Sequence, residues 1–263
     1  MQRYRRPVIA ALLAVALLGL AGSHQGEADA AGPTIPLPDA DRSQLDRLLG
    51  KGVVGDPLPS APLAGIDAYL PPKGSVMSLR VVTSDGTSTT ETHTIEHTTD
   101  AAFAPGWHYT IKGIVEFYFQ KDSAGNICTI AEKDLDKEVL TRFTPGEPLI
   151  IPGLKPGQSV RARHKVEVFD LSNLKKVSHS GWLDVAYTYM GTYRVMVPGG
   201  TYEAALIRWD YNGEVGPATI KESEYRFLAD GAGEVAMVQI RSISALLIYS
   251  EHTKRGKLLE RRQ

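Results

Sequence analysis

Cysteine is almost absent from this chain. Cys128 is the only cysteine among 263 residues, so no disulfide can form within the chain, and there is no Cys-x-x-Cys motif for redox chemistry. The residues around it, Ile127-Cys128-Thr129-Ile130, are typical of a strand, which predicts a buried and unreactive thiol. The fold must therefore be held together by a hydrophobic core.

Net charge and catalytic motifs are also lacking. The 29 Lys and Arg residues nearly balance the 30 Asp and Glu residues, which gives no electrostatic argument for binding nucleic acid or an anionic membrane. The chain contains no Gly-x-Ser-x-Gly, no His-Glu-x-x-His, no phosphate loop and no EF-hand pattern. These absences favour a non-enzymatic protein without a cofactor, and they leave no catalytic residue to assign.

Long hydrophobic runs are missing as well. The apolar run Val8–Leu20 covers about thirteen residues, fewer than the roughly 20 that cross a bilayer as a helix. It follows three arginines and precedes small residues, which is the arrangement of a secretory signal peptide. We expect residues 1–30 to be that signal, and the mature protein to be periplasmic or secreted without a membrane span. The candidate cleavage sites follow Ala21, Ser23 and Ala30.

The segment Leu20-Ala21-Gly22-Ser23 resembles a bacterial lipoprotein cleavage box. That box requires a cysteine thiol at its last position, where this chain has Ser23. Lipid attachment by this route is therefore excluded.

Residues 31–74 form a lead-in rich in proline and glycine, which should be largely extended or irregular. One short helix is predicted from about Asp41 to Leu49, because leucines recur there at helical spacing and Gly50 follows. The lead-in either packs across the main domain or serves as a flexible spacer.

Residues 75–253 are organised as strands. About ten β-rich runs alternate with turn residues, and no amphipathic helix lies between them, which favours an antiparallel all-β domain. We expect one large curved sheet, a half-barrel or open barrel with a concave apolar face, with a two-sheet β-sandwich as the alternative. Residues 254–263 are expected to be a basic, frayed tail. Within this domain we predict a single strand over Trp107–Gln120. We also predict turns at Asp85-Gly86 and Asp230-Gly231, and a type II turn at Val197-Pro198-Gly199-Gly200.

The last of these turns carries a resemblance. Val197-Pro198-Gly199-Gly200-Thr201-Tyr202 resembles a hairpin of bacterial periplasmic and envelope proteins of unknown function, which have Val-Pro-x-Gly-Thr followed by Phe or Tyr. Residues 225–236 are similar to the aromatic strand and glycine turn of those proteins. Gly199 departs from their usual alanine. The resemblance covers roughly residues 158–250 and implies an envelope location and a fold similar to periplasmic lipoprotein-carrier half-barrels, but no activity and no functional residues.

One constellation of residues suggests chemistry. Alternation along Thr87–Thr98 places Glu91, His93 and His97 on one face of a strand. If this strand pairs with Trp107–Gln120, His97 would face His108 at a distance suitable for a two-histidine metal site. A threonine-rich, solvated sheet face is the competing interpretation.

Two other groups have simpler interpretations. Arg161, Arg163 and Lys165 alternate with Val160, Ala162, His164 and Val166, as on a strand with one wet face, although they would also suit an anionic ligand. Aromatic residues are frequent between positions 182 and 211, where they either fill the core or line a pocket. They are Trp182, Tyr187, Tyr189, Tyr193, Trp209 and Tyr211.

Three hypotheses for function follow. The first is an exported, non-enzymatic envelope protein that binds an apolar or amphipathic ligand or another envelope component. The second is a structural or adaptor protein that reaches a partner through the lead-in. The third is a metal-assisted hydrolase that uses Glu91, His93, His97 and His108.

Overall fold

The computed structural model describes residues 32–245 and 249–263, and the predicted signal peptide lies outside these residues. The lead-in contains α1 (Asp39–Leu49), β1 (Val54–Leu58) and a single 3-10 turn, η1 (Ile66–Ala68). The predicted helix is confirmed. The sequence did not predict β1 because Pro57 interrupts it, but β1 pairs only with β9, so the missing donor of Pro57 disrupts no second ladder. Within the described residues, no helix combines the length and apolar character that crossing a bilayer requires.

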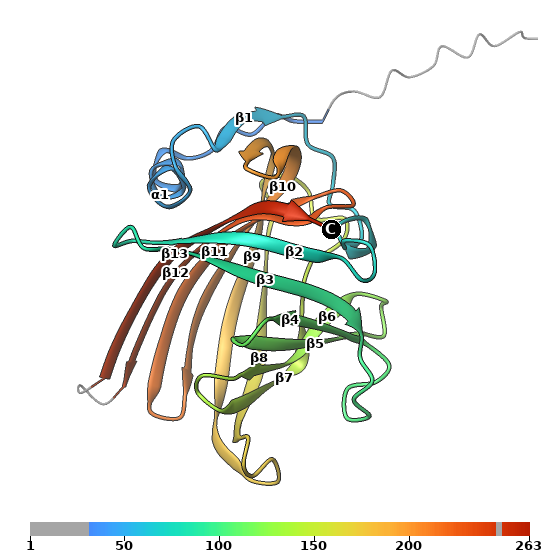
Figure 1. Cartoon of the computed structure of the whole chain (residues 1–263), viewed down its shortest axis with the longest axis vertical. Coiled ribbons are helices and arrows are strands. Elements are labelled where there is room, and N and C mark those ends of the chain that lie inside the picture. Colours follow the sequence, from blue (N-terminus) through green and yellow to red (C-terminus); the bar gives the residue numbers. More distant parts are fainter. Residues whose placement is uncertain (1–31, 246–248) are drawn as a thin grey trace, which may run out of the picture. The chain divides into compact units, whose positions relative to one another are not determined.

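Twelve antiparallel strands form a closed barrel in which each strand pairs with its neighbours in the sequence (Figure 1). The last strand pairs with the first, from Arg255 opposite Thr83 to Arg262 opposite Met77. The strands are β2 (Val76–Thr83), β3 (Ser88–His97), β4 (Trp107–Ile111), β5 (Val115–Lys121), β6 (Ile127–Asp134), β7 (Val139–Pro148), β8 (Ser159–Asp170), β9 (Val177–Val197), β10 (Gly200–Val215), β11 (Ala218–Ala229), β12 (Gly233–Ala245) and β13 (Tyr249–Arg262).

The all-β antiparallel prediction is confirmed, whereas the open half-barrel of about ten strands and the two-sheet sandwich are wrong. Two features account for the difference. The run Trp107–Gln120 divides into β4 and β5 at Gly113, whose φ of 75° makes a turn. The predicted basic tail at 254–263 is instead the second half of β13, with Lys257, Leu258 and Leu259 buried. Its charges had suggested solvent exposure, but Lys257 has a carboxylate partner inside the barrel.

The predicted Asp-Gly turns lie between β2 and β3 and between β11 and β12, with positive φ at Gly86 and Gly231. The β9–β10 hairpin turns at Pro198-Gly199, as expected, but not as a type II turn. Gly200, with φ 140°, has the positive φ that the prediction gave to Gly199.

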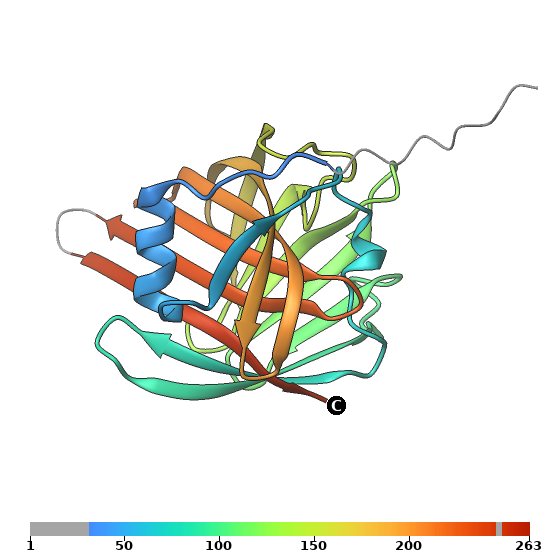
Figure 2. The same cartoon turned by 90° about the horizontal axis from the view of Figure 1, so that it is seen from above.

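Helix α1 covers the outer face of the barrel over β12, β13 and β2 (Figure 2). Leu45 and Leu48 of the helix join a buried cluster with Tyr225, Phe227 and other outward-facing residues of the strands. The helix approaches closely because β13 has Gly256 beneath it. A Cβ atom there would lie 2.4 Å from the carbonyl oxygen of Leu48.

Residues 59–72, which we call the plug, close one end of the barrel. Leu63 donates to Leu154 and accepts from Gly153, at 2.9 and 2.8 Å, while Ala68 accepts from Gly231 at 2.7 Å. Leu63 and Ile66 are buried in the inner cluster that includes Tyr187, Tyr189 and Ile207. Of the two arrangements considered for the lead-in, the structure therefore has the packed one.

Candidate functional site

Strand β3 presents Glu91, His93 and Ile95 to the barrel interior, the lumen, as alternation predicts. The predicted pairing of His97 with His108 is wrong. His97 lies opposite Trp107 and His108 opposite Glu96, and this offset of one residue places the two histidines on opposite faces of the sheet. Among residues 32–245 and 249–263, no group of three or more His, Cys, Asp or Glu side chains is placed to hold a metal ion.

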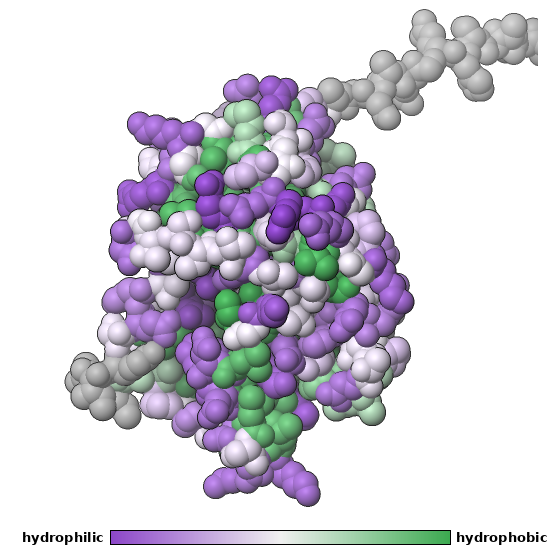
Figure 3. Space-filling view, in the orientation of Figure 1, coloured by the Kyte–Doolittle hydropathy of each residue, from purple (hydrophilic) through white to green (hydrophobic). Residues whose placement is uncertain are grey.

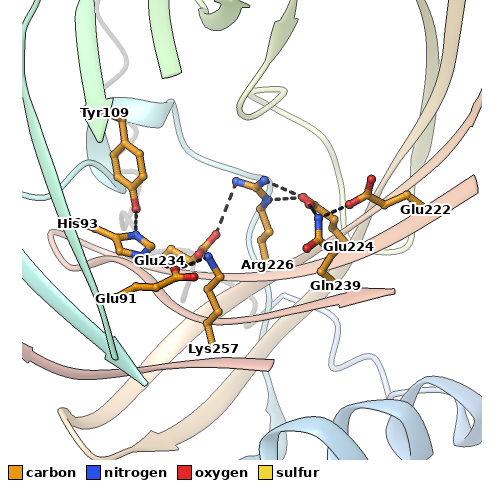
Figure 4. A network of polar contacts seen from close by, with 9 residues as sticks. All are labelled: Glu91, His93, Tyr109, Glu222, Glu224, Arg226, Glu234, Gln239 and Lys257. Carbon is orange, nitrogen blue, oxygen red and sulfur yellow. Dashed lines mark hydrogen bonds and ion pairs between the residues drawn. The ribbon is translucent and has the colours of Figure 1, made fainter. Parts of the chain in front are cut away.

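Glu91 and His93 instead belong to a buried polar group, the Glu91 cluster, with Tyr109 of β4 and Lys257 of β13 (Figure 4). Lys257 Nζ donates to Glu91 Oε2 at 2.6 Å, and His93 Nε2 lies 2.8 Å from the same oxygen. Tyr109 hydrogen-bonds to His93 Nδ1. His93 and Lys257 are each 1% exposed, so the pair lies in a region of low dielectric.

The Glu91 cluster holds its charges in a defined arrangement. Burial alone would raise the Glu91 pKa, but the His93 hydrogen bond and the Lys257 charge lower it to about 2. Burial lowers the pKa of His93, and the Lys257 charge lowers it further. His93 is therefore neutral, donating from Nε2 to the Glu91 carboxylate and accepting the Tyr109 hydroxyl proton at Nδ1.

A second group, the Arg226 cluster, lies beside the first and comprises Glu222, Glu224, Arg226, Glu234 and Gln239 (Figure 4). Arg226 Nη2 donates to Glu224 Oε2 at 2.7 Å, and its Nη1 lies 3.6 Å from Glu234 Oε2. Gln239 Nε2 donates to both Glu222 and Glu224.

Arg255 of β13 connects the two clusters. Its Nε donates to Gln239 Oε1 at 2.6 Å, and its Nη1 lies 3.9 Å from Glu91 Oε1. A continuous polar network thus extends across β3, β4, β11, β12 and β13 on the inner face.

The neighbouring carboxyl groups Glu222 and Glu224 differ in ionisation. Burial raises the pKa of Glu222, and the negative charge of Glu224 raises it further. Burial also acts to raise the pKa of Glu224, but the Arg226 guanidinium outweighs it and the pKa is lowered. Glu224 is therefore the ionised partner of Arg226, and Glu222 holds a proton more tightly than an exposed glutamate.

Aromatic side chains form the lumen wall next to the Arg226 cluster. The Arg226 guanidinium lies 4.3 Å from the Trp209 ring centroid, and Tyr187 and Tyr211 meet Trp209 edge to face. Tyr187 and Trp209 are almost completely buried, as the core-filling interpretation predicts, whereas Trp182 is 52% exposed on the outer face. The buried Trp209 Nε1 has no hydrogen-bond partner among the described residues.

A third polar group lies on β7, β8 and β9 and is joined to the aromatic wall through Tyr187. His164 is hydrogen-bonded to the Pro145 carbonyl at 2.9 Å and to the Tyr187 hydroxyl at 3.2 Å, and that hydroxyl lies 3.4 Å from Glu147 Oε1. Burial and the charge of Glu224 on β11 together raise the pKa of Glu147 to about 7, against a Tyr211 hydrogen bond that acts to lower it. Glu147 and Glu224 lie on strands far apart in the sheet, so their interaction crosses the lumen.

Solvent accessibility differs among the inward-facing side chains. Tyr187, Tyr189 and Ile207 are at most 2% exposed. The charged side chains of Arg226, Arg241 and Arg255 retain 25, 23 and 28% exposure, although Arg226 lies directly opposite Ile207. Solvent therefore reaches these guanidinium groups, while the aromatic and aliphatic side chains beside them are buried.

The remaining predicted groups have structural roles. Arg163 pairs with Asp184 at 2.6 Å on the exposed outer face, which agrees with a wet strand face, and Cys128 is a buried free thiol, as predicted. Hydrophilic residues predominate on the side of the molecule drawn in Figure 3.

Sequence reasoning missed Arg226, Glu224 and Lys257. Ser223-Glu224-Tyr225-Arg226-Phe227 has a period-two pattern in which the apolar face is the one with Tyr225 and Phe227. That face is indeed buried, but beneath α1 on the outside of the barrel, where Tyr225 donates to Asp41 at 2.6 Å. The charged face therefore points inward, a reversal that only the position of α1 reveals.

No protein-family model matches the chain, and no curated protein matches it. Two solved structures are similar to it. One is an exported protein with a YmcC-like fold from Bacteroides fragilis, with a TM-score of 0.43, 15% identity, and coverage of 74% of this chain and 98% of that chain. The other is a lipoprotein from Parabacteroides distasonis, with a TM-score of 0.37, 14% identity and the same two coverages. Similarity at this level assigns no activity.

Proposed function

We propose that this protein is an exported, non-enzymatic binding protein that takes a small amphipathic ligand into the lumen of its barrel. Export is supported by the arginine-rich, short apolar segment within residues 1–30. The ligand would enter from the end opposite the plug, the end toward which β12 carries the partly exposed Arg241.

The observation that carries the proposal is the juxtaposition of Arg226 and Trp209 inside the barrel. Arg226 is ion-paired yet 25% exposed, and it lies over the ring of Trp209, which has only 3% exposure. A lumen with a wet polar surface next to an aromatic wall suits a molecule with both polar and apolar parts. A purely apolar ligand, which the sequence also allowed, would leave these charges without solvent.

Energetics support a functional role for the network. Buried ion pairs are weak contributors to stability, and replacing them with apolar side chains is often neutral or stabilising. A barrel whose only role was structural would gain from an apolar interior. The adaptor hypothesis is less well supported, because residues 59–72 are engaged with the barrel end.

Trp209 provides a direct test. In a Trp107→Phe, Trp182→Phe variant, Trp209 is the only remaining tryptophan, and its fluorescence reports on the lumen. Titration with a neutral amphiphile, decyl maltoside, below its micelle concentration should change the Trp209 emission saturably. Arg226→Gln in this background should weaken binding, whereas the matched outer-face control Arg163→Gln should not. A folded protein whose Trp209 emission responds to no amphiphile, whether neutral or charged, would contradict the proposal.

A further inference from the structure

The lumen contains more acidic than basic side chains. On the described inner face, the carboxyl groups are Glu91, Glu132, Asp134, Glu147, Glu222, Glu224, Glu234 and Glu251, and the cationic groups are Lys121, Arg226, Arg241, Arg255 and Lys257. Further titratable groups on this face are His93, His97, Tyr109, His164, Tyr187, Tyr189 and Tyr211.

Most of the cationic side chains already form ion pairs with carboxyl groups of this face. Lys257 pairs with Glu91, Arg226 with Glu224 and Glu234, and Arg241 with Glu251. Glu132 and Glu147 face the lumen from β6 and β7 and form no ion pair with these cations at salt-bridge distance. Burial raises the pKa of both groups. Negative neighbours act in the same direction, Asp134 and Glu224 on Glu132 and Glu224 on Glu147, while Arg241 and Arg226 act against them.

A second observation points to a ligand at the same place. Trp209 faces the lumen between Tyr187 and Tyr211, is 3% exposed, and has an indole N–H without a partner in the described residues. A buried donor without an acceptor costs free energy, about 1 to 3 kcal/mol. A ligand that carries a hydrogen-bond acceptor would remove this cost.

The geometry points to an amphipathic ligand whose polar end carries a positive charge, such as an amine, next to a hydrogen-bond acceptor. This inference rests on the proposed function and specifies the ligand class. The positive group would lie between the carboxyl groups of β6 and β7 and those of β11, and the apolar part would lie along the aromatic wall. The acceptor would receive the Trp209 N–H.

Proton exchange accompanies this binding. Burial raises the pKa of Glu132 and that of Glu147, the latter to about 7, so the empty lumen holds protons near neutral pH. A cation placed beside these groups favours their ionised forms and lowers their pKa values. Binding of a cationic ligand should therefore release protons, whereas binding of an anionic ligand should take them up.

Calorimetry with three amphiphiles of equal chain length tests the inference. Decylammonium, decyl maltoside and decyl sulfate are titrated at pH 7 in buffers of different ionisation enthalpy. Decylammonium should bind about tenfold or more tightly than the other two and should release protons. If decyl maltoside or decyl sulfate binds as tightly as decylammonium, the charge assignment is overturned and the proposed function stands. If none of the three binds, the proposed function fails as well.

Three variants of the full chain sharpen the result. Glu147→Gln should retain the fold, because glutamine resembles the protonated acid, and it should reduce both the decylammonium preference and the proton release. Glu132→Gln should act in the same direction, which keeps the test decisive if one variant does not fold. Glu214→Gln makes the same charge change at an exposed position and should alter neither quantity.

Discussion

Removing the ammonium group of Lys257 should take away the nearest cation of the buried Glu91 carboxylate and leave Arg255, at 3.9 Å, as a more distant partner. In the native protein, the Glu91 pKa lies at about 2 against an ordinary value of 4.5. The difference of about 2.5 units corresponds to about 3 kcal/mol of stability above pH 4.5, and this contribution is lost as the pH falls toward 2. Glu91 is only 7% exposed, so solvent screening reduces this value little. We expect Lys257→Met to lower the free energy of unfolding at pH 7 by about 3 kcal/mol, in line with other broken buried pairs.

The pH dependence should also weaken. Without Lys257, burial is opposed by the His93 hydrogen bond and by Arg255, so the Glu91 pKa moves up toward its unfolded value and the variant should lose less stability than the wild type as the pH falls below 4.5. In Lys257→Met, Glu91→Gln, the charge is gone and an oxygen remains to accept from His93, so most of the lost stability should return.

Urea unfolding followed by circular dichroism between about pH 2 and pH 8 measures both effects. Lys254→Met is the matched control, because Lys254 is the exposed neighbour on the same strand, and it should change the free energy of unfolding by less than about 0.5 kcal/mol. The reasoning fails if Lys257→Met costs less than about 1 kcal/mol, or if the double variant is as unstable as the single one.

Three more predictions concern the helix layer and the lumen. Gly256→Val should destabilise the barrel by more than about 2 kcal/mol and increase hydrogen exchange in α1, because its Cβ would lie 2.4 Å from the Leu48 carbonyl oxygen. Tyr225→Phe should cost about 1 to 3 kcal/mol in thermal unfolding, because it removes the 2.6 Å hydrogen bond to the buried Asp41 carboxylate. Glu147→Gln should become more stable than the wild type as the pH rises from 4.5 through 7, by up to about 3 kcal/mol in urea titrations, because the native pKa of Glu147 is raised to about 7 and the wild type loses that stability over this range.

Each of these predictions has a contrary outcome. Gly65→Ala is the control for the first, since no atom lies within 4 Å of the place that a Cβ atom would take there, and an equal loss in both glycine variants would exclude the helix contact as the cause. Normal hydrogen exchange of α1 in Tyr225→Phe, with unchanged stability, would show that the Asp41 contact does not anchor the helix. A constant stability difference between wild type and Glu147→Gln across the pH range would contradict the raised pKa.

The parts of the fold that depend on short-range sequence signals were predictable. The Asp-Gly turns are short-range signals and were placed correctly, and so was the helix that ends at Leu49. Closure of the barrel was not predictable, because it depends on pairing β13 with β2 across most of the chain. The charge of Lys257 indicated a solvated tail until its partner, Glu91, was found on a distant strand.

The candidate site was predicted in part, for a similar reason. Alternation placed Glu91 and His93 on one inward face, which is correct. The proposed partner His108 depended on the register between two strands, and an offset of one residue moved it to the outside. The actual partners, Tyr109 and Lys257, come from two other strands. Their separation from Glu91 along the sequence matches no known motif, so the sequence does not indicate that they share a site.

The seam between β2 and β13 also dictates when the barrel can be completed during folding. These are its first and last strands, so a chain that emerges from its amino end has two unpaired edges until the final strand is delivered. Contacts of such large sequence separation form slowly, because the entropy of a very long loop must be lost first. Unpaired strand edges can pair with other chains, so we expect the chain to be most prone to aggregation before β13 pairs with β2.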